Sequence, residues 1–201
     1  MRIMKECNLS QVMIDLLDGQ IIIYPTETTY GIGCDAYNQT AVDKIFAIKE
    51  RLKNKPLLVL VDSVEKAKKY LVWNKNLEAL ANKYWPGPLT VIANANDEGK
   101  KLAQGVVSME GKIAIRVTAH PTAKKLVEAL GRPLVSTSAN IGGDQEIYDP
   151  KILVETFSQH EPAPDLLVDF GVLPFCSPTT IVDVTGKEIK IIRQGELVID
   201  L

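Results

Sequence analysis

Several features of common protein classes are missing from this sequence of 201 residues. Its three cysteines, Cys7, Cys34 and Cys176, are scattered and odd in number, which argues against a disulfide framework or a cysteine-based zinc site. No apolar run reaches the roughly 20 residues that a membrane-spanning helix needs. The polar N-terminal stretch also lacks the apolar centre of a secretory signal. We therefore expect a cytoplasmic protein with no membrane contact.

Familiar catalytic patterns are missing too. There is no glycine-rich phosphate loop and no Gly-x-Gly-x-x-Gly, of which Gly31-Ile32-Gly33 is only a fragment. His120 and His160 stand far apart without a metal-ligand pattern, and no serine lies in a nucleophile elbow. The net charge of −2 and the aromatic content of 6% argue against a broad nucleic-acid surface as the main function. No protein metal site is expected.

What is present suits one packed domain spanning residues 1–201, because 46% of the residues are hydrophobic. Apolar periodicity predicts helices over residues 8–17, 40–52, 64–70, 76–84 and 121–130, with Thr40 opening the second by a capping box. Short apolar runs predict strands over residues 21–24, 57–61, 89–93, 113–117, 133–135, 166–168, 180–184 and 188–192. Strands alternate with helices early and pair as hairpins late. The fold class is therefore α/β, with a twisted mixed parallel and antiparallel sheet flanked by helices.

The densest basic group is Lys49-Glu50-Arg51, followed by Lys53 and Lys55. One interpretation is a solvated helix C-terminus, where cations favour the helix dipole. The other is an anion site, in which arginine offers a planar fork and lysine a movable charge. Residues i and i+2 on a helix do not face each other, so both cations reach one ligand only if the helix ends between them.

Two polar segments follow apolar strands. Residues 24–33 and 134–143 combine hydroxyl side chains with glycines, which suits either an ordinary turn or an approach to phosphate and ribose. Arg116 lies inside an otherwise apolar strand, so it needs an internal ion-pair partner or a ligand carboxylate. Arg193 poses the same question less specifically.

Together these segments resemble the YrdC-like family of threonylcarbamoyl-AMP synthases, whose hallmark is Lys-x-Arg followed far downstream by Ser-x-Asn. The hallmark positions here are Lys49, Arg51, Ser138 and Asn140. The resemblance covers nearly the whole chain and rests on Tyr24-Pro-Thr-Glu-Thr-Thr-Tyr-Gly-Ile-Gly33, Lys55-Pro-Leu57, Trp85-Pro-Gly-Pro-Leu-Thr90, Arg116-Val-Thr-Ala-His-Pro121, Ser136-Thr-Ser-Ala-Asn140 and Thr179-Thr-Ile-Val-Asp183.

The resemblance implies that the protein makes threonylcarbamoyl-AMP and pyrophosphate from L-threonine, bicarbonate and ATP, as a nucleotidyltransferase that serves tRNA modification. A separate tRNA threonylcarbamoyl transferase would use the product, and Mg²⁺ would arrive with the ATP. The residues implied for ATP are Lys49, Arg51, Lys55, Lys112, Ser138, Asn140 and Arg193, with Lys49 and Arg51 catalytic. The residues implied for threonine are Thr28, Leu60, Arg116, Ser136 and Thr179, with Arg116 on the carboxylate.

Two positions depart from the family pattern. Leu52 stands where proline often follows Lys-x-Arg, so the next turn is expected to be less rigid. The sequence ends at Leu201 without the second domain of some members, so closure of the site is expected to come from elsewhere. Two alternatives stay open: a YciO-like paralogue with weak synthase activity, and a module that binds tRNA or double-stranded RNA through the basic group. RNA binding would weaken steeply with salt and need no threonine.

Overall fold

Ten short strands form one mixed sheet in the part of the chain that the computed structural model describes, residues 1–5, 7–52 and 55–200. Their order across the sheet is β1-β8-β2-β3-β7-β4-β6-β5-β9-β10. The strands are β1 (Arg2–Met4), β2 (Ile22–Pro25), β3 (Tyr30–Gly33), β4 (Leu58–Val61), β5 (Leu89–Asn94), β6 (Lys112–Val117), β7 (Leu134–Ser138), β8 (Leu166–Val168), β9 (Thr180–Asp183) and β10 (Lys190–Arg193).

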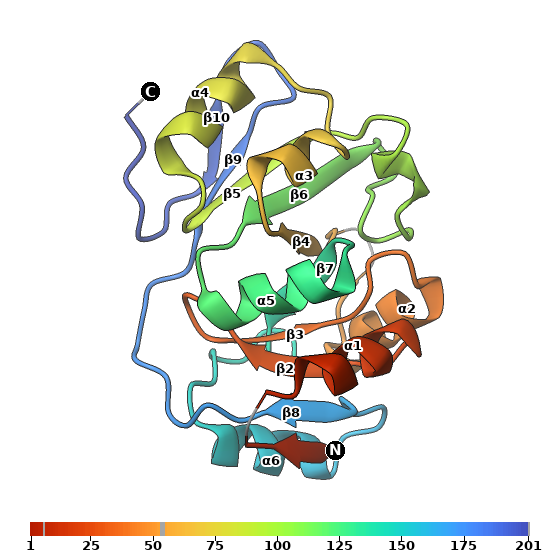
Figure 1. Cartoon of the computed structure of the whole chain (residues 1–201). Helices are drawn as coiled ribbons and strands as arrows, with labels where there is room; N and C mark the ends of the chain where they lie inside the picture. Colours follow the sequence, from red (N-terminus) through yellow and green to blue (C-terminus); the bar gives the residue numbers. More distant parts are fainter. Residues whose placement is uncertain (6, 53–54, 201) are drawn as a thin grey trace.

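The sheet mixes both pairing directions, which confirms the predicted fold class. β8 pairs in parallel with β1 and β2, β4 with β6, and β5 with β9. The remaining neighbours pair antiparallel, including the late hairpin of β9 and β10. Figure 1 shows β1, β8, β2 and β3 in the lower part and β5, β9 and β10 in the upper part, with the connection from β8 to β9 running along the left edge.

Seven helical segments flank the sheet in the described part of the chain. They are α1 (Leu9–Leu17), α2 (Gln39–Ile48), α3 (Val64–Lys68), α4 (Lys75–Tyr84), the 3₁₀ turn η1 (Gly99–Lys101), α5 (Pro121–Leu130) and α6 (Pro150–Ser158). Helix α5 shows how the sequence sets its ends: Pro121 occupies the first turn, and Gly131 ends the helix at φ 69°, a conformation that favours glycine.

Three predicted boundaries were wrong. Helix α2 is capped by Asn38, whose side chain accepts from the Ala41 amide, rather than by a capping box at Thr40. It ends at Ile48, so Leu52 is not part of its apolar face and is 72% exposed. Strand β7 continues through Ser138, where a loop was expected, because Ser138 pairs with Gly31 of β3.

Four described elements were not predicted at all: β1, β3, η1 and α6. The segment that forms β3 carries Gly31 and Gly33, which locally favour a turn. Its pairing with both β2 and β7 overrides that preference. Tertiary context therefore decided what the local sequence left ambiguous.

The side-chain alternation of the strands creates two different faces. One face of the sheet carries Val59, Ile115 and Val135, which belong to a large core that also contains residues of α2, α3, α4 and α6. The opposite face carries Leu60 and Leu134, which belong to a smaller core with residues of α1 and α5. Helices α1 and α5 cover only part of this second face, and the uncovered part holds the site described below.

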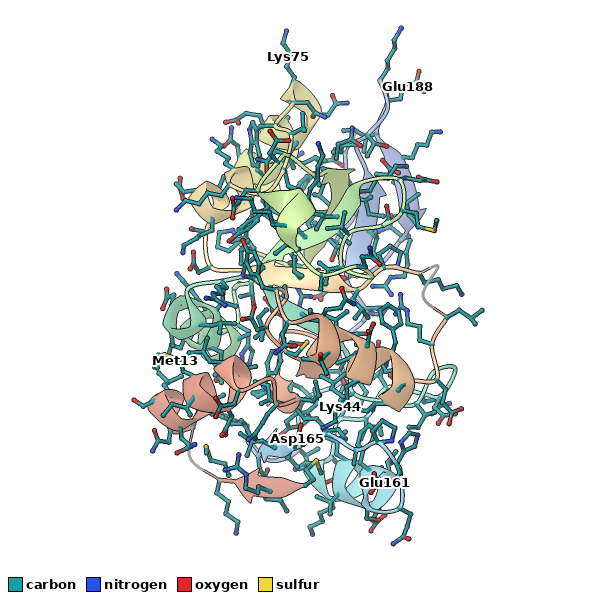
Figure 2. All side chains as sticks on the ribbon, turned by 90° about the vertical axis from the view of Figure 1, so that its right-hand side faces the viewer. Met13, Lys44, Lys75, Glu161, Asp165 and Glu188 are labelled. Carbon is teal, nitrogen blue, oxygen red and sulfur yellow. The ribbon has the colours of Figure 1, made fainter. Side chains whose placement is uncertain are left out.

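An ion pair ties α2 to the chain just before β8. The Nζ atom of Lys44 lies 2.8 Å from Oδ2 of Asp165, which also accepts from the Ile21 amide at 2.7 Å. Figure 2 labels Lys44 and Asp165 close to each other in the lower half, whereas Lys75 and Glu188 extend outward at the opposite end. None of the helices in the described part of the chain has the length and apolar character to cross a membrane.

Candidate active site

A cavity of about 490 Å³ lies on the uncovered part of the sheet. Its walls combine cationic, hydroxyl and aliphatic side chains. The lining residues are Thr26, Thr28, Thr29, Gly31, Arg51, Lys55, Pro56, Leu58, Thr90, Ile92, Ala114, Arg116, Ser136, Thr137, Ser138, Glu146, Pro178, Thr179, Ile181, Ile192 and Arg193. Four of them are arginine or lysine and one is a carboxylate, so the cavity favours an anionic ligand.

Helix α2 ends at Ile48, so Lys49 and Arg51 both follow its last residue, and only Arg51 lines the cavity. Lys49 is the C-cap of α2, and Glu50 follows with φ 48° in the left-handed region. A glutamate adopts this conformation at a cost of about 1 kcal/mol, so the reversal is held by its surroundings. Because of this turn, Lys49 and Arg51 do not have the relative orientation of residues i and i+2 in a helix.

Lys49 is buried behind the cavity wall rather than on it. Its Nζ atom donates to the carbonyl oxygens of Ser138 and Asn140, at 2.5 and 2.9 Å, and to Oδ1 of Asn140 at 2.9 Å. Burial and the nearby charge of Arg51 lower the pKa of Lys49 to about 8. The ammonium therefore holds the turn after β7 in place from behind the cavity wall.

Arg51 and Lys55 line the cavity directly. The Nε of Arg51 donates to the carbonyl oxygen of Lys55 at 3.0 Å, and its Nη2 to that of Pro56 at 3.1 Å. Burial lowers the pKa of Arg51, although an arginine stays protonated at neutral pH. Lys53, the fourth cation of the predicted basic group, lies outside the described residues.

The turn after β7 is an interlocked polar unit. Ser138 Oγ lies 2.7 Å from Asn140 Oδ1, and Asn140 Nδ2 donates to the carbonyl oxygen of Asp144 at 2.6 Å. The Gly142 amide donates to the carbonyl oxygen of Lys49 at 2.8 Å. A Cβ at Gly142 would lie 2.4 Å from that oxygen, so only glycine fits this approach. Ser138 lines the cavity, whereas Asn140 supports it from behind.

Arg116 reaches the cavity from β6 and is only 3% exposed. Its Nη2 lies 3.3 Å from Oε2 of Glu27, a carboxylate in the turn between β2 and β3. Burial favours the neutral form of Glu27, but Arg116 and the donors of Thr118 and Ala119 hold its pKa below the ordinary value. Arg116 thus has an internal ion-pair partner, Glu27. It also lines the cavity, where it can meet a ligand carboxylate.

Hydroxyl groups surround the Arg116 end. Thr28, Ser136 and Thr179 are all buried and all line the cavity. Thr179 Oγ1 lies 3.2 Å from Thr90 Oγ1 and accepts from Arg193 Nη2 at 3.1 Å. Arg193 also donates to the Thr179 carbonyl oxygen through Nε and Nη2, at 3.0 and 2.9 Å. These contacts fix the arginine against β9.

Four expected residues do not line the cavity: Lys49 and Asn140 support it from behind, and Leu60 and Lys112 lie elsewhere. Leu60 packs fully buried in the core beneath α5, and Leu58, two residues earlier on the same face, lines the cavity instead. Lys112 lies 3.1 Å from Glu110 and 3.6 Å from Asp183, at the far end of β6 from Arg116. Both side chains are thus engaged away from the cavity wall.

Sequence reasoning missed two carboxylates at this site. Glu146 is the only carboxylate lining the cavity among the described residues, and its charge acts on Lys49 and Arg193. Glu27 was overlooked because the 24–33 segment was interpreted through its hydroxyl groups. The strand prediction at Arg116 contained a usable signal, since a buried arginine requires a carboxylate somewhere. Within the described residues, no group of three or more His, Cys, Asp or Glu side chains could hold a metal ion.

The fold and the cavity define an α/β protein with a cationic, hydroxyl-lined binding cleft. The Sua5/YciO/YrdC family, described as telomere recombination, matches residues 15–195, and the chain belongs to this family. A threonylcarbamoyl-AMP synthase of Pseudoalteromonas translucida (strain TAC 125) is 34% identical over 179 residues, covering 87% of this chain and 91% of the relative.

Two solved structures extend the comparison. P. abyssi Sua5 complexed with L-threonine superimposes with a TM-score of 0.86 at 27% identity, covering 98% of this chain. The match covers 57% of the longer Sua5 chain. E. coli YciO superimposes with a TM-score of 0.82 at 25% identity, covering 97% of this chain and 94% of YciO.

Proposed function

We propose that the protein is an enzyme, a threonylcarbamoyl-AMP synthase that uses L-threonine, bicarbonate and ATP. The observation that carries the proposal is the division of one cavity into two chemically different ends. Arg51, Lys55 and Ser138 provide charge and donors for phosphates, and Arg116 with its surrounding hydroxyl groups provides for an amino acid. The synthase name of the Pseudoalteromonas translucida relative and the threonine complex of P. abyssi Sua5 support this assignment.

The reaction requires the two ends to act together. Threonine's amine and bicarbonate combine to a carbamate with loss of water. A carbamate oxygen then attacks the α-phosphorus of ATP, and the bond to the β-phosphate oxygen breaks to release pyrophosphate. Negative charge builds on the phosphates as this bond breaks, so fixed cations such as Arg51 favour the transition state. Holding both reactants in one cavity adds the advantage of proximity.

In this mechanism Arg116 binds the threonine carboxylate, while Thr28, Ser136 and Thr179 contact the rest of the amino acid. Lys49 acts from behind by fixing the Ser138 turn, with Asn140 as its partner. Arg193 lies where it can reach the nucleotide from β10, and Lys112 and Leu60 act only indirectly. Mg²⁺ would come with ATP, since Glu146 alone offers a carboxylate on the described cavity wall.

Because AMP is transferred from ATP to the carbamate, the protein would be a nucleotidyltransferase. Its product would be delivered to a tRNA threonylcarbamoyl transferase for tRNA modification. A direct contact with tRNA is a further part of this proposal. It would be confined to the mouth of the cavity, because the basic residues Arg51 and Lys55 lie there and not on a broad surface. The similarity to E. coli YciO over 97% of the chain favours one second candidate, a paralogue with weak synthase activity.

The deciding experiment incubates the protein with ATP, threonine and bicarbonate and measures pyrophosphate and threonylcarbamoyl-AMP. We expect both products, each dependent on threonine and on bicarbonate. The matched controls omit one substrate at a time and replace the wild type with Arg51→Ala. Well-folded protein that forms neither product would rule out the synthase. A slow but threonine-dependent rate would favour the YciO-like alternative.

A further inference from the structure

A carboxylate lies behind the Arg116 end of the cavity without lining it. One oxygen of Glu27, Oε1, accepts hydrogen bonds from Thr118 Oγ1 at 2.6 Å and from the amides of Ala119 and His120 at 2.7 and 3.2 Å. These contacts fix the chain just before α5. The other oxygen, Oε2, has no hydrogen-bond partner among the described residues, and neither has Nε of Arg116. Glu27 Oε2 therefore faces Arg116 with its charge alone.

This pairing sets Arg116 apart from the other arginines of the cavity. Arg51 donates to neutral carbonyl oxygens, and Arg193 to the neutral oxygens of Thr179. The positive charge of Arg51 remains available to an anion, whereas the charges of Glu146 and of Arg116 both act on Arg193. Arg116 lies 3.3 Å from an ionised carboxylate, so the pair of Arg116 and Glu27 is close to neutral. Arg51 and Lys55 thus give the cavity a cationic end, whereas at the Arg116 end a carboxylate lies behind the arginine that lines the wall.

The two ends favour different ligands. A phosphate or a simple carboxylate carries only negative charge, which Arg116 attracts and Glu27 repels. An amino acid carries a carboxylate for Arg116 and an ammonium that the negative charge of Glu27 attracts. We propose that Glu27 is a specificity-determining residue that makes this end select a zwitterionic amino acid over simple anions, including the phosphates of ATP. The inference rests on the proposed function and deepens it.

The size of the effect follows from Coulomb attraction in a partly buried site. Glu27 does not line the cavity, so its charge acts on a ligand's ammonium across the Arg116 side chain. With an effective dielectric constant of about 20, this attraction still changes relative affinity by roughly ten-fold. Two ligands that share the carboxylate and differ only in the ammonium therefore isolate the effect of the Glu27 charge. The ratio of the affinities for these two ligands therefore measures the effect of the Glu27 charge, even where a substitution changes both affinities.

The test uses calorimetric titration of the full chain with threonine and with 3-hydroxybutyrate, which is threonine without its amine. Wild-type protein is expected to prefer threonine by more than roughly ten-fold. Glu27→Gln retains an oxygen for the Thr118, Ala119 and His120 donors but removes the charge, and should reduce the preference by roughly ten-fold. Glu27→Asp should retain most of it. Glu128→Gln, an exposed charge removal on α5, is the control and should leave the ratio unchanged.

The outcomes separate the two levels of the proposal. If wild-type protein binds no threonine, the proposed function fails. If threonine binds but Glu27→Gln leaves the ratio unchanged, or Glu27→Asp loses it as fully as Glu27→Gln, the inference about Glu27 is overturned. Should Glu27→Gln not fold, the wild type still decides, because equal affinity for both ligands would overturn the inference. Inorganic phosphate should also compete with threonine better in Glu27→Gln than in the wild type.

Discussion

Lys49 and Asn140, 91 residues apart in the sequence, are joined by a hydrogen bond of 2.9 Å between the lysine ammonium and the asparagine side-chain oxygen. The same ammonium donates to the Ser138 carbonyl oxygen. Lys49 of the Lys-x-Arg element and the Ser-x-Asn turn thus form one hydrogen-bonded unit. Lys49 is part of the support of the site, while Arg51 and Ser138 line the cavity.

Because they form one unit, Lys49→Ala and Asn140→Ala should have overlapping effects. Each is expected to lower turnover about 100-fold, as the loss of a positioned polar group does in other active sites. The double variant should be little worse than either single one, since groups in one hydrogen-bonded network are not additive. Steady-state rates of the three proteins measure this. Lys75→Ala, an exposed cation on α4, controls for charge loss (Figure 2).

The pKa of Lys49 predicts an alkaline limit to activity. Its protonated form donates the three hydrogen bonds, and burial and Arg51 lower its pKa to about 8. Activity should therefore be full below pH 8 and fall as pH rises above it. Lys49→Arg, which stays protonated, should remove this limb of the pH–rate profile even if its rate is lower. A wild-type profile that stays flat well above pH 8 would contradict the assignment.

Stability should change with pH in the opposite sense. In the unfolded chain the Lys49 pKa returns to its ordinary value of 10.5, so between pH 8 and 10.5 the unfolded state binds more protons. The contribution of Lys49 to the free energy of unfolding therefore rises with pH over this window. Denaturant unfolding at several pH values, compared between wild type and Lys49→Arg, separates this effect from the loss of activity.

Arg51→Ala should affect ATP and pyrophosphate chemistry much more than folding. The side chain supplies a cation to the cavity wall, so turnover is expected to fall about 100-fold. The Arg51→Ala variant also loses the two hydrogen bonds to the carbonyl oxygens of Lys55 and Pro56, which lowers the free energy of unfolding by about 1 kcal/mol for each bond. Turnover at saturating threonine, together with thermal unfolding, checks both. Near wild-type turnover would show that Arg51 does not contact the phosphates.

The sequence allowed the mixed sheet and part of this cavity to be predicted, for identifiable reasons. Arg116 was found because an arginine inside an apolar strand needs a partner, and Ser136 because hydroxyl side chains follow an apolar strand. Thr28 and Thr179 came from the family resemblance. Periodicity says which face a side chain occupies but not how far along the strand a covering helix reaches. Leu60 lies under α5, so the expectation that it lines the cavity was wrong, and Leu58 lines it instead.

The burial of Lys49, like that of Leu60, depends on residues that are distant in the sequence. No local pattern shows that the carbonyl oxygens of Ser138 and Asn140 converge on one ammonium. The Glu27 pairing depends on the turn after β2 reaching β6, which lies four places away in the sheet order. Such contacts follow from topology, and a single sequence does not specify topology.

Removing Arg116 should affect both stability and threonine use. Arg116→Ala leaves Glu27 unpaired in a mostly buried position, which should lower the free energy of unfolding by about 3 kcal/mol. The double variant Arg116→Ala with Glu27→Ala should recover part of this loss, because no uncompensated charge remains. Chemical denaturation of the four proteins of this cycle measures the coupling. Arg116→Lys should raise the threonine KM more than it lowers kcat, and an unchanged KM would exclude a carboxylate contact.

Gly142→Ala should impair activity through backbone crowding. Its new Cβ would lie 2.4 Å from the carbonyl oxygen of Lys49, so the turn after β7 must shift and carry Ser138 with it. We expect turnover to fall at least ten-fold, as displacement of a positioned group by about 1 Å can do. Gly186→Ala, where the nearest neighbouring atom would be 3.8 Å away, is the matched control and should retain full activity.

The floor of the cavity is made of seven strands that are consecutive neighbours in the sheet, from β3 to β10. Residues such as Gly31, Leu58, Thr90 and Ser136 are held there by the hydrogen-bond ladder of the strands, not by a loop that must become ordered around the ligand. Little conformational entropy is then lost when a ligand enters, so more of the contact energy remains as affinity. The floor of the cavity should also lose its structure only when the whole sheet unfolds. Loss of activity in denaturant should therefore occur at the same denaturant concentration as global unfolding.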